Sequence, residues 1–419
     1  MRLKDRPHLQ KSVQHGFRGN DMARELPLSG VTVIDLGQVY NGPYATFLMA
    51  MAGAEVIKVE PPGGENLRRR SVVGGAALPF AMLNSNKKFV TINLKEQRGK
   101  ELLRELAEKA DVLLENFAPG VMDRLGVGYD TLKAINPRLI YAAGTGYGST
   151  GAYKDLPAMD LTVQAMSGIM SVTGFEDRPP VKCGPAICDF SGGTHLYGAV
   201  MTALFERERT GVGRKVEVAM VEAVYATLSS SLGLWYGSQG AAPARTGNRH
   251  GGMAESPYNV YSAADGFIAV LCVGETHWQS LLQALGRTDL SDDPRFSTLM
   301  ERVNRMDEVD EIVQGVTRSK TREELGDVFL RFRVPFAPVR NLTEVTSDPE
   351  FHASGFLNRI DHPEYGEVVV SRSPMRYEDA ALPDIVPSGR LGCDNDQVLT
   401  DKLGLDQASI DQLREDGVI

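Results

Sequence analysis

The sequence predicts an α/β fold, and two observations support that prediction. From about residue 28 to residue 143, short apolar runs that suit strands alternate with stretches that suit amphipathic helices. Such alternation is typical of a mostly parallel sheet with helices on both faces. From about residue 230 the pattern changes to a hairpin followed by helices, which predicts a second region of mixed α and β structure. A chain of 419 residues is long enough for about two or three domains.

The elements of the first region follow one another in a regular order. We predict strands over residues 31–36, 55–60, 89–92, 112–114 and 139–143, and helices over residues 43–51 and 97–109. Pro43 suits the first turn of its helix, and Gly53 suits the end of that helix. Ligands of such folds bind beyond the carboxyl ends of the strands. Three predicted loops leave those ends, at residues 37–42, 115–120 and 144–151.

The second region opens with a predicted hairpin, in which residues 258–261 and 267–272 flank Ala264-Asp265-Gly266. Helices are predicted over residues 276–285, 306–316 and 321–332. The last of these helices begins with Thr321 and Glu324, which fit a capping box. Beyond Pro338 the pattern becomes strand-like again, and it ends in a polar amphipathic helix over residues 409–416.

Composition excludes several classes of protein. A net charge of −9 argues against non-specific binding to nucleic acid. No apolar run approaches the roughly twenty residues that span a membrane, and the polar N-terminus does not resemble a signal peptide. The four cysteines are dispersed and have neither disulfide nor zinc spacing. We therefore expect a cytoplasmic protein with no metal site, no membrane span and no nucleic-acid partner.

The most informative single residue is Asp189. Asp189 follows an apolar run and precedes a turn of small residues. A predicted helix over residues 194–208 follows directly. At that place free backbone N–H groups and the helix dipole favour an anion, and Gly192 and Gly193 leave room for another backbone or a ligand. Asp189 is then either a helix cap or a carboxylate nucleophile, and its position alone does not decide between the two.

A second motif points weakly to a different function. Residues 146–151 match the glycine fingerprint of dinucleotide-binding proteins and follow a predicted strand. The residues that follow are a poor start for a helix, and no acidic residue ends a second strand about twenty residues further on. A hydride-transfer enzyme that binds nicotinamide here therefore remains only a remote alternative.

Several blocks, in the right order, resemble the class III coenzyme A transferases, the family of formyl-CoA and carnitine/crotonobetaine CoA transferases. The resemblance runs from residue 28 to the C-terminus. The blocks are LSGVTVIDL (28–36), Gly42-Pro43, GAEVIKVE (53–60), NKK (86–88), ENFAPG (115–120), NPRLIY (136–141) and TGVG (210–213).

The resemblance implies roles for individual residues. Asp189 matches the family's catalytic aspartate, Gln38 and Val39 fall in the loop that lines the CoA and carboxylate site, and Gly251 and Gly252 match a glycine loop that covers the intermediate. The remaining matched positions bind CoA in the family, and here they are Arg68, Ile92, Lys95, Asn116, Phe117 and Arg124. No prosthetic group is implied, because CoA and acyl-CoA are substrates.

The implied reaction transfers CoA from an acyl-CoA donor to a carboxylic acid through an aspartyl anhydride and an aspartyl-CoA thioester. Two departures leave the acids open: the glycine run at residues 251–252 is short, and Tyr40 replaces a small polar residue near the acyl group. Common usage in the family suggests succinyl-CoA or another short dicarboxylate donor.

Two alternatives belong to the same superfamily. The first is a 2-methylacyl-CoA racemase, whose second base is a histidine at the position of Met159, and a methionine cannot transfer a proton. The second is a non-catalytic CoA-binding subunit of a heteromeric transferase, which the presence of Asp189 disfavours.

The family also implies an architecture. It predicts a large Rossmann-like, doubly wound domain, a smaller α+β domain and an interlocked homodimer, although a heteromer is also conceivable. On this basis we divide the chain into a polar N-terminal extension (1–27), the large CoA-binding domain (28–229), the small domain (230–340) and a C-terminal segment that returns to the large domain (341–419).

Overall fold

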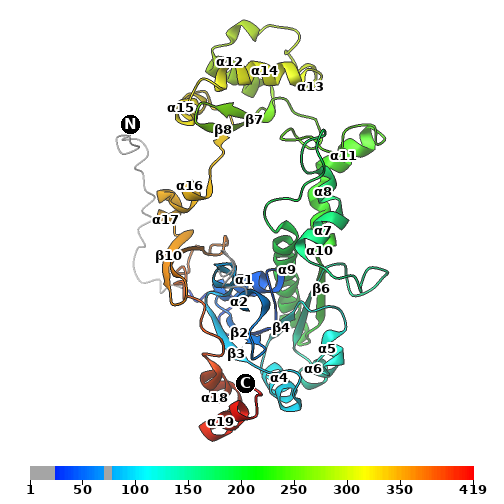
Figure 1. The fold of residues 1–419 in the computed structure, drawn as a ribbon, viewed down its shortest axis with the longest axis vertical. Helices are drawn as coiled ribbons and strands as arrows, with labels where there is room; N and C mark the ends of the chain where they lie inside the picture. The colour runs from blue at the N-terminus through cyan, green and yellow to red at the C-terminus, as the bar shows by residue number, and fades with distance from the viewer. Residues whose placement is uncertain (1–23, 70–77) are drawn as a thin grey trace.

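A sheet of six parallel strands forms the centre of the larger part of the molecule (Figure 1). The computed structural model describes residues 24–69 and 78–419, so nearly all of the predicted extension (1–27) lies outside the described residues. The strands lie in the order β3-β2-β1-β4-β5-β6. They are β1 Thr32–Asp35, β2 Glu55–Glu60, β3 Lys87–Thr91, β4 Val112–Glu115, β5 Ile140–Thr145 and β6 Lys215–Ala219. The predicted parallel α/β fold is therefore confirmed.

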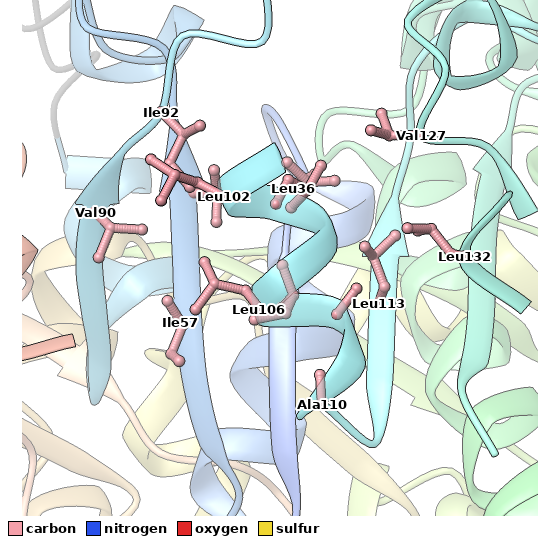
Figure 2. Packing of buried hydrophobic residues seen from close by; sticks show 14 of the residues in the cluster. Leu36, Ile57, Val90, Ile92, Leu102, Leu106, Ala110, Leu113, Val127 and Leu132 are labelled. Atoms are coloured by element: carbon pink, nitrogen blue, oxygen red, sulfur yellow. The ribbon is translucent and has the colours of Figure 1, made fainter. Parts of the chain in front are cut away.

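Helices cover both faces of this sheet. Helices α1 (Asn41–Met51) and α9 (Ile187–Thr210) cover one face, whereas α4 (Gln97–Glu108), α6 (Tyr129–Ile135), α18 (Asn395–Leu403) and α19 (Gln407–Glu415) cover the other. Successive strand residues point to opposite faces, so Val33 joins the core under α1 and α9, and Ile34 joins the core under α4. Figure 2 shows Leu102 and Leu106 of α4 over the strands that carry Ile57 and Val90.

The end of the chain closes one edge of the sheet. Strand β3 is an edge strand, and two of its backbone N–H groups face the start of α18 rather than another strand. The N–H of Phe89 donates to Asp394 Oδ2 at 2.7 Å, and the N–H of Thr91 donates to Asn395 Oδ1 at 2.8 Å. Side chains thus satisfy groups that would otherwise be open to pairing with another chain.

A smaller unit lies at the far end of the molecule (Figure 1). It holds an antiparallel sheet of β7 (Tyr258–Ala263), β8 (Gly266–Leu271) and β9 (Phe336–Pro338). Its helices are α12 (Glu275–Leu285), α13 (Leu299–Val303), α14 (Met306–Thr317) and α15 (Arg322–Phe332), with a core around the buried ring of Trp278. We call β7–β9 and α12–α15 the small unit. The predicted hairpin and capping box are both present here.

Two separate segments join the small unit to the large sheet, so the ribbon traces an open ring (Figure 1). One segment holds α7 (Asp160–Ser167), α8 (Ile169–Val172), α10 (Met220–Tyr225) and α11 (Ser229–Gly237), and the other holds α16 (Leu342–Thr346), α17 (Pro349–Ala353), β10 (Leu357–His362) and β11 (Gly366–Ser371). The short helices α2 (Asn66–Arg69), α3 (Leu78–Asn84) and α5 (Val121–Arg124) and 3₁₀ turns at Ala226–Leu228 and Thr288–Leu290 complete the elements. None of the described helices is long and apolar enough to cross a membrane.

One predicted element is wrong at its start. Helix α9 begins at Ile187 and not at Thr194, so Asp189 lies within its first turn instead of in a loop before it. Asp189 is therefore not the N-cap, which is Ala186. The early start depends on an acceptor from a distant part of the chain, the side chain of Asp160, which receives the N–H of Cys188 at 2.8 Å.

Strand β6 is absent from the predicted strands. Its sequence, KVEVA, alternates polar and apolar residues, and at the edge of the sheet it stays partly exposed except at Ala219. Because it pairs with β5 in parallel, its carboxyl end reaches the same edge as the loops after β1, β4 and β5. This strand therefore adds Met220 to the residues that can face a ligand.

Candidate functional site

A cavity of about 550 Å³ lies at the carboxyl edge of the large sheet. The loops after the neighbouring strands β1 and β4 form one side of it, and these are the strands between which the strand order reverses. Such a reversal is where doubly wound folds bind ligands. The lining residues from the three predicted loops include Gln38, Val39, Asn41, Asn116, Phe117, Ala118, Pro119, Gly144, Thr145, Gly146, Tyr147 and Gly148.

Asp189 reaches this cavity from the first turn of α9. A neighbouring carboxylate at the start of α7, that of Asp160, holds the turn in place. Asp160 Oδ1 accepts the N–H groups of Cys188 at 2.8 Å and Asp189 at 3.3 Å, and its Oδ2 accepts Gln164 Nε2 at 2.6 Å. Asn41 Nδ2 donates to the backbone oxygen of Asp189 at 3.3 Å. The backbone of Asp189 is thereby fixed from two sides.

The carboxylate of Asp189 is buried and has an unusual electrostatic environment. Its residue is only 7% exposed, and no described residue donates a hydrogen bond to its side chain. Burial, together with the charge of Asp160, raises the pKa of Asp189 to about 7. Burial also raises the pKa of the adjacent Cys188 thiol to about 12, so that thiol is inert near neutral pH. The first turn of α9 therefore presents one candidate nucleophile, the carboxylate.

Replacing Asp189 by asparagine is expected to stabilise the fold. Because the pKa of Asp189 rises from 3.8 to about 7 on folding, the folded state holds the proton more tightly, and stability falls as the pH rises from about 4 to 7. Each pKa unit corresponds to about 1.4 kcal/mol, so Asp189→Asn should gain up to about 4 kcal/mol near pH 8 and little near pH 4.

Thermal unfolding at both pH values measures this effect. Asp155 lines the same cavity but is exposed, so Asp155→Asn is the matched control and should leave the melting temperature unchanged. An Asp189→Asn variant that is less stable than the parent protein near pH 8 would contradict the proposed cost of burying this charge.

The loop after β1 is held in one conformation by side chains from other elements. Asn116 binds both backbone groups of Gln38: its Oδ1 accepts the N–H at 2.7 Å, and its Nδ2 donates to the carbonyl at 2.9 Å. Val39 follows with a φ of +63°, a strained conformation for a β-branched residue. The amide of Asn116, which the family resemblance implies as a CoA contact, is thus already engaged in positioning Gln38.

A buried polar network lies beneath this loop. Lys87 Nζ donates to Asp35 Oδ2 at 2.9 Å, and both side chains are fully buried. Asp35 Oδ1 accepts the N–H of Gly37 at 2.8 Å, and Lys58 Nζ donates to the Gly37 carbonyl at 2.7 Å. Burial lowers the pKa of Lys87 to about 8, although the Asp35 carboxylate opposes that shift. The network fixes where the loop leaves the sheet, and sequence reasoning did not identify it.

The predicted CoA-binding residues fall into two groups. Val39, Asn116, Phe117 and Arg124 line the cavity, and Arg124 makes no ion pair with any described residue. The other three, Arg68, Ile92 and Lys95, do not line it.

Their positions differ from one another. Arg68 pairs with Glu60 at 2.9 Å, donates to the Gly389 carbonyl at 3.1 Å and covers the ring of Phe80, so its charge is already satisfied. Ile92 is buried in the core under α4. Lys95 is exposed just beyond the carboxyl end of β3, on the same edge of the sheet as the cavity.

The glycine pair lies apart from Asp189. Gly251 lines a second cavity of about 410 Å³, which is mostly apolar and bounded by α8, α10 and α11. A Cβ on Gly251 would lie 3.1 Å from Ser231 Oγ, and one on Gly252 would lie 3.1 Å from the ring of His250. Neither glycine lines the cavity that contains Asp189.

Asn41 is a site residue that the sequence did not single out. A Cβ on Gly192 would lie 2.3 Å from Asn41 Nδ2, and one on Gly144 would lie 2.3 Å from Asn41 Oδ1. Gly192 and Gly193 therefore admit another part of the protein, the start of α1, and not a ligand. Asn41 Oδ1 is buried without a hydrogen-bond partner among the described residues.

Apolar side chains also contribute to the cavity and to its surroundings. Met159 and Met220 line the cavity, and the ring of Phe190 stacks on Tyr40 with centroids 5.9 Å apart. The loop with the dinucleotide-like fingerprint lines the cavity at Gly146 and Gly148, but the next helix, α7, begins only at Asp160. In the described part of the chain, no group of three or more His, Cys, Asp or Glu side chains is arranged to hold a metal ion.

Proteins with a doubly wound parallel sheet bind their ligands at the point where the strand order reverses, and the cavity of this chain lies there. The model of CoA-transferase family III matches residues 28–395. The chain belongs to this family and is an enzyme of the CoA-transferase class. The family resemblance read from the sequence is therefore confirmed.

Characterised relatives are similar over most of their length. Formyl-CoA:oxalate CoA-transferase of Streptomyces avermitilis is 35% identical over 94% of this chain and 99% of its own. Acetyl-CoA:oxalate CoA-transferase of Acetobacter aceti is 39% identical over 84% of this chain and 90% of its own. Among solved structures, a CaiB/BaiF family protein from Brucella suis is 33% identical, with a TM-score of 0.79 over 90% of this chain and 100% of its own.

Proposed function

We propose that this enzyme moves CoA from an acyl-CoA donor to a small carboxylic acid, and that Asp189 carries the reaction covalently. One observation carries the proposal: Asp189 is a buried carboxylate at a ligand cavity, and no described residue donates a hydrogen bond to its side chain. A carboxylate held in this way is a stronger nucleophile than one in water, because a higher pKa accompanies higher basicity.

The proposed steps exchange carboxyl derivatives of similar energy. An oxygen of Asp189 attacks the thioester carbonyl, the C–S bond breaks, and a mixed anhydride and CoA thiolate form. The thiolate attacks the aspartyl carbonyl, the donor acid leaves as its carboxylate, and an aspartyl-CoA thioester remains. The acceptor carboxylate then attacks that thioester and releases CoA thiolate, which attacks the acceptor carbonyl of the new anhydride and regenerates Asp189. No ATP or metal is required for the balance.

The cavity suggests how CoA would bind. Phe117 offers an aromatic face to the adenine, and Arg124 and Lys154 are cations with no ion-pair partner among the described residues, which suits phosphates. Gln38 and Val39 would lie nearer the reacting carbonyl, and Lys95 would meet the nucleotide from the end of β3. The positioned backbone of the loop after β1 supports this arrangement.

Several further features belong to the proposal. We propose that two copies of the chain interlock as a homodimer, that the enzyme is cytoplasmic, and that the chain divides at 229/230 and 340/341. The open ring of the ribbon is compatible with the passage of a second chain (Figure 1). Oxalate, the acid named for two relatives, is the first acceptor to test, and formyl-, acetyl- and succinyl-CoA are the first donors.

Trapping with hydroxylamine tests the covalent step. The protein is incubated with each acyl-CoA, quenched with hydroxylamine and analysed by peptide mass spectrometry. An aspartyl hydroxamate on Asp189 that depends on one particular acyl-CoA is expected, whereas Asp155 and Asp160 should stay unmodified as internal controls. Binding of CoA without an adduct from any donor would contradict the proposal, and exchange of solvent deuterium into a 2-methylacyl-CoA would point to the racemase instead.

A further inference from the structure

The segment that carries the glycine pair is attached both to the joining segment that holds α8 and to the small unit. At its beginning, Gly247 N–H donates to the Gly174 carbonyl at 3.0 Å, and Arg245 Nε donates to the Phe175 carbonyl at 3.1 Å. Residues 174 and 175 follow α8, on the side of the large sheet. The first attachment therefore joins this segment, residues 245–253, to the part of the ring that leads back to Asp189.

The second attachment joins the segment to the small unit through Arg249. Its Nε donates to Asp310 Oδ2 at 2.9 Å, and its Nη2 donates to Asp310 Oδ2 at 2.6 Å and to Asp307 Oδ1 at 2.5 Å. Both aspartates belong to α14. Asp310 also accepts Tyr261 Oη at 2.7 Å and Asn259 Nδ2 at 2.9 Å, so strand β7 and helix α14 meet at this carboxylate.

The glycine pair lies directly after this anchor. His250 packs edge-on against Tyr258 with ring centroids 5.4 Å apart, and its Nδ1 lies 3.2 Å from the N–H of Gly252. Met253 then turns with a φ of +49°. Gly251 and Gly252 therefore have a backbone path that is short, tightly turned and fixed to the small unit at Arg249.

We propose that Arg249 is a positioning residue that holds the Gly251–Gly252 segment to α14, so that the position of the small unit sets the position of this segment. The inference rests on the proposed function and on the role that the family resemblance implies for the glycine pair, which is to cover the intermediate. Neither glycine lines the Asp189 cavity of its own chain in this structure, and the Arg249–Asp310 link fixes the segment to the small unit.

Loss of this link should allow hydrolysis of the aspartyl-CoA thioester. When the segment is not held in place, water competes with the acceptor acid at the thioester. The water oxygen attacks the aspartyl carbonyl, the C–S bond breaks, and CoA leaves as its thiol with one proton of the water, while the second proton is released to solvent and the Asp189 carboxylate is restored. Hydrolysis of acyl-CoA without transfer therefore reports on the position of the segment, which a purely structural role of Arg249 would not affect.

The test compares Arg249→Met with Arg295→Met. Arg295 also reaches α14, through Glu308 at 3.3 Å, but it does not contact the glycine segment and serves as the matched control. Arg249→Met loses the charge-assisted hydrogen bonds to α14, so the segment is held less strongly. We expect the ratio of hydrolysis to transfer to increase by about 10-fold in this variant. The KM for the acyl-CoA should stay unchanged, and Arg295→Met should behave as the parent protein.

Hydrogen exchange of residues 246–253 gives a second readout that does not depend on activity. Arg249→Met should speed exchange of these amides by about 10-fold, and Arg249→Lys, which keeps the charge but not the paired N–H groups, should lie between. If Arg249→Met does not fold, Arg249→Lys and Asp310→Asn carry the same comparison. Parental hydrolysis ratios and parental exchange rates in these variants would overturn the inference.

The two proposals fail in different ways. If the parent protein forms the Asp189 hydroxamate and Arg249→Met transfers CoA with no increase in hydrolysis, only the proposed anchoring role of Arg249 is refuted. A parent protein that forms no adduct removes the covalent mechanism, while faster exchange in Arg249→Met would still show that Arg249 holds the segment.

Discussion

Asp189→Ala is expected to abolish transfer, with a fall in kcat of at least about 10⁴-fold, the scale on which enzymes lose activity without their nucleophile. The variant removes the only carboxylate in the first turn of α9, and the adjacent Cys188 thiol cannot replace it because burial raises its pKa to about 12. Initial rates with the donor and acceptor identified by trapping measure the effect.

Two controls separate chemistry from folding and binding. CoA affinity, measured by calorimetry, should change by less than about 2-fold in Asp189→Ala, since the residues proposed to bind the adenine and phosphates, Phe117 and Arg124, are unchanged in this variant. Asp155→Ala removes an exposed carboxylate from the same cavity and should keep the parental rate. A parental rate in Asp189→Ala would eliminate Asp189 as the covalent carrier.

Asp160 is expected to have the next largest effect, because it supports Asp189 in two ways. Its Oδ1 accepts the N–H groups of Cys188 and Asp189, at 2.8 and 3.3 Å, and its charge contributes to the raised pKa of Asp189. Asp160→Ala leaves those buried donors without an acceptor, which costs about 1–3 kcal/mol. We expect kcat to fall by about 10- to 100-fold as the first turn of α9 loosens.

Asp160→Asn separates the two contributions, since an amide oxygen still accepts those N–H groups but carries no charge. The pKa of Asp189 in the free enzyme should fall from about 7 toward its ordinary value. The carboxylate must be ionised to attack, so the parent enzyme gains kcat/KM as the pH rises to about 7. In Asp160→Asn that rise should move to lower pH, and the plateau should be lower because the carboxylate is less basic. An unmoved pH profile would show that the charge of Asp160 does not act on Asp189.

The fold was largely accessible from the sequence because its signals are local. Alternating apolar runs located five of the six strands of the parallel sheet, and the Thr321–Glu324 capping box placed the start of α15. Strand β6 escaped because, at the sheet edge, its KVEVA sequence is only half buried and shows no strong apolar run. The start of α9 was misplaced because its support comes from Asp160, which lies 29 positions earlier in the chain.

The candidate site was accessible in part. Asp189, Gln38, Val39, Asn116, Phe117 and Arg124 do line one cavity, whereas Arg68, Ile92, Lys95 and the glycine pair do not. The sequence does not show which hydrogen-bond and ion-pair partners these side chains have within the protein. The amide of Asn116 binds the backbone of Gln38, and the guanidinium of Arg68 pairs with Glu60. Asn41 was missed because its importance depends on how closely it approaches Gly144 and Gly192, far along the chain.

The closure of β3 by the start of α18 has a consequence for synthesis of the protein. A ribosome releases the chain from its N-terminus, so β3 emerges long before Asp394 and Asn395, which satisfy its free N–H groups. During that interval, the edge of a growing sheet is open to the same edge of a chain on a neighbouring ribosome. A chain truncated before residue 394 would keep this edge open, so we expect it to self-associate more readily than the parent protein.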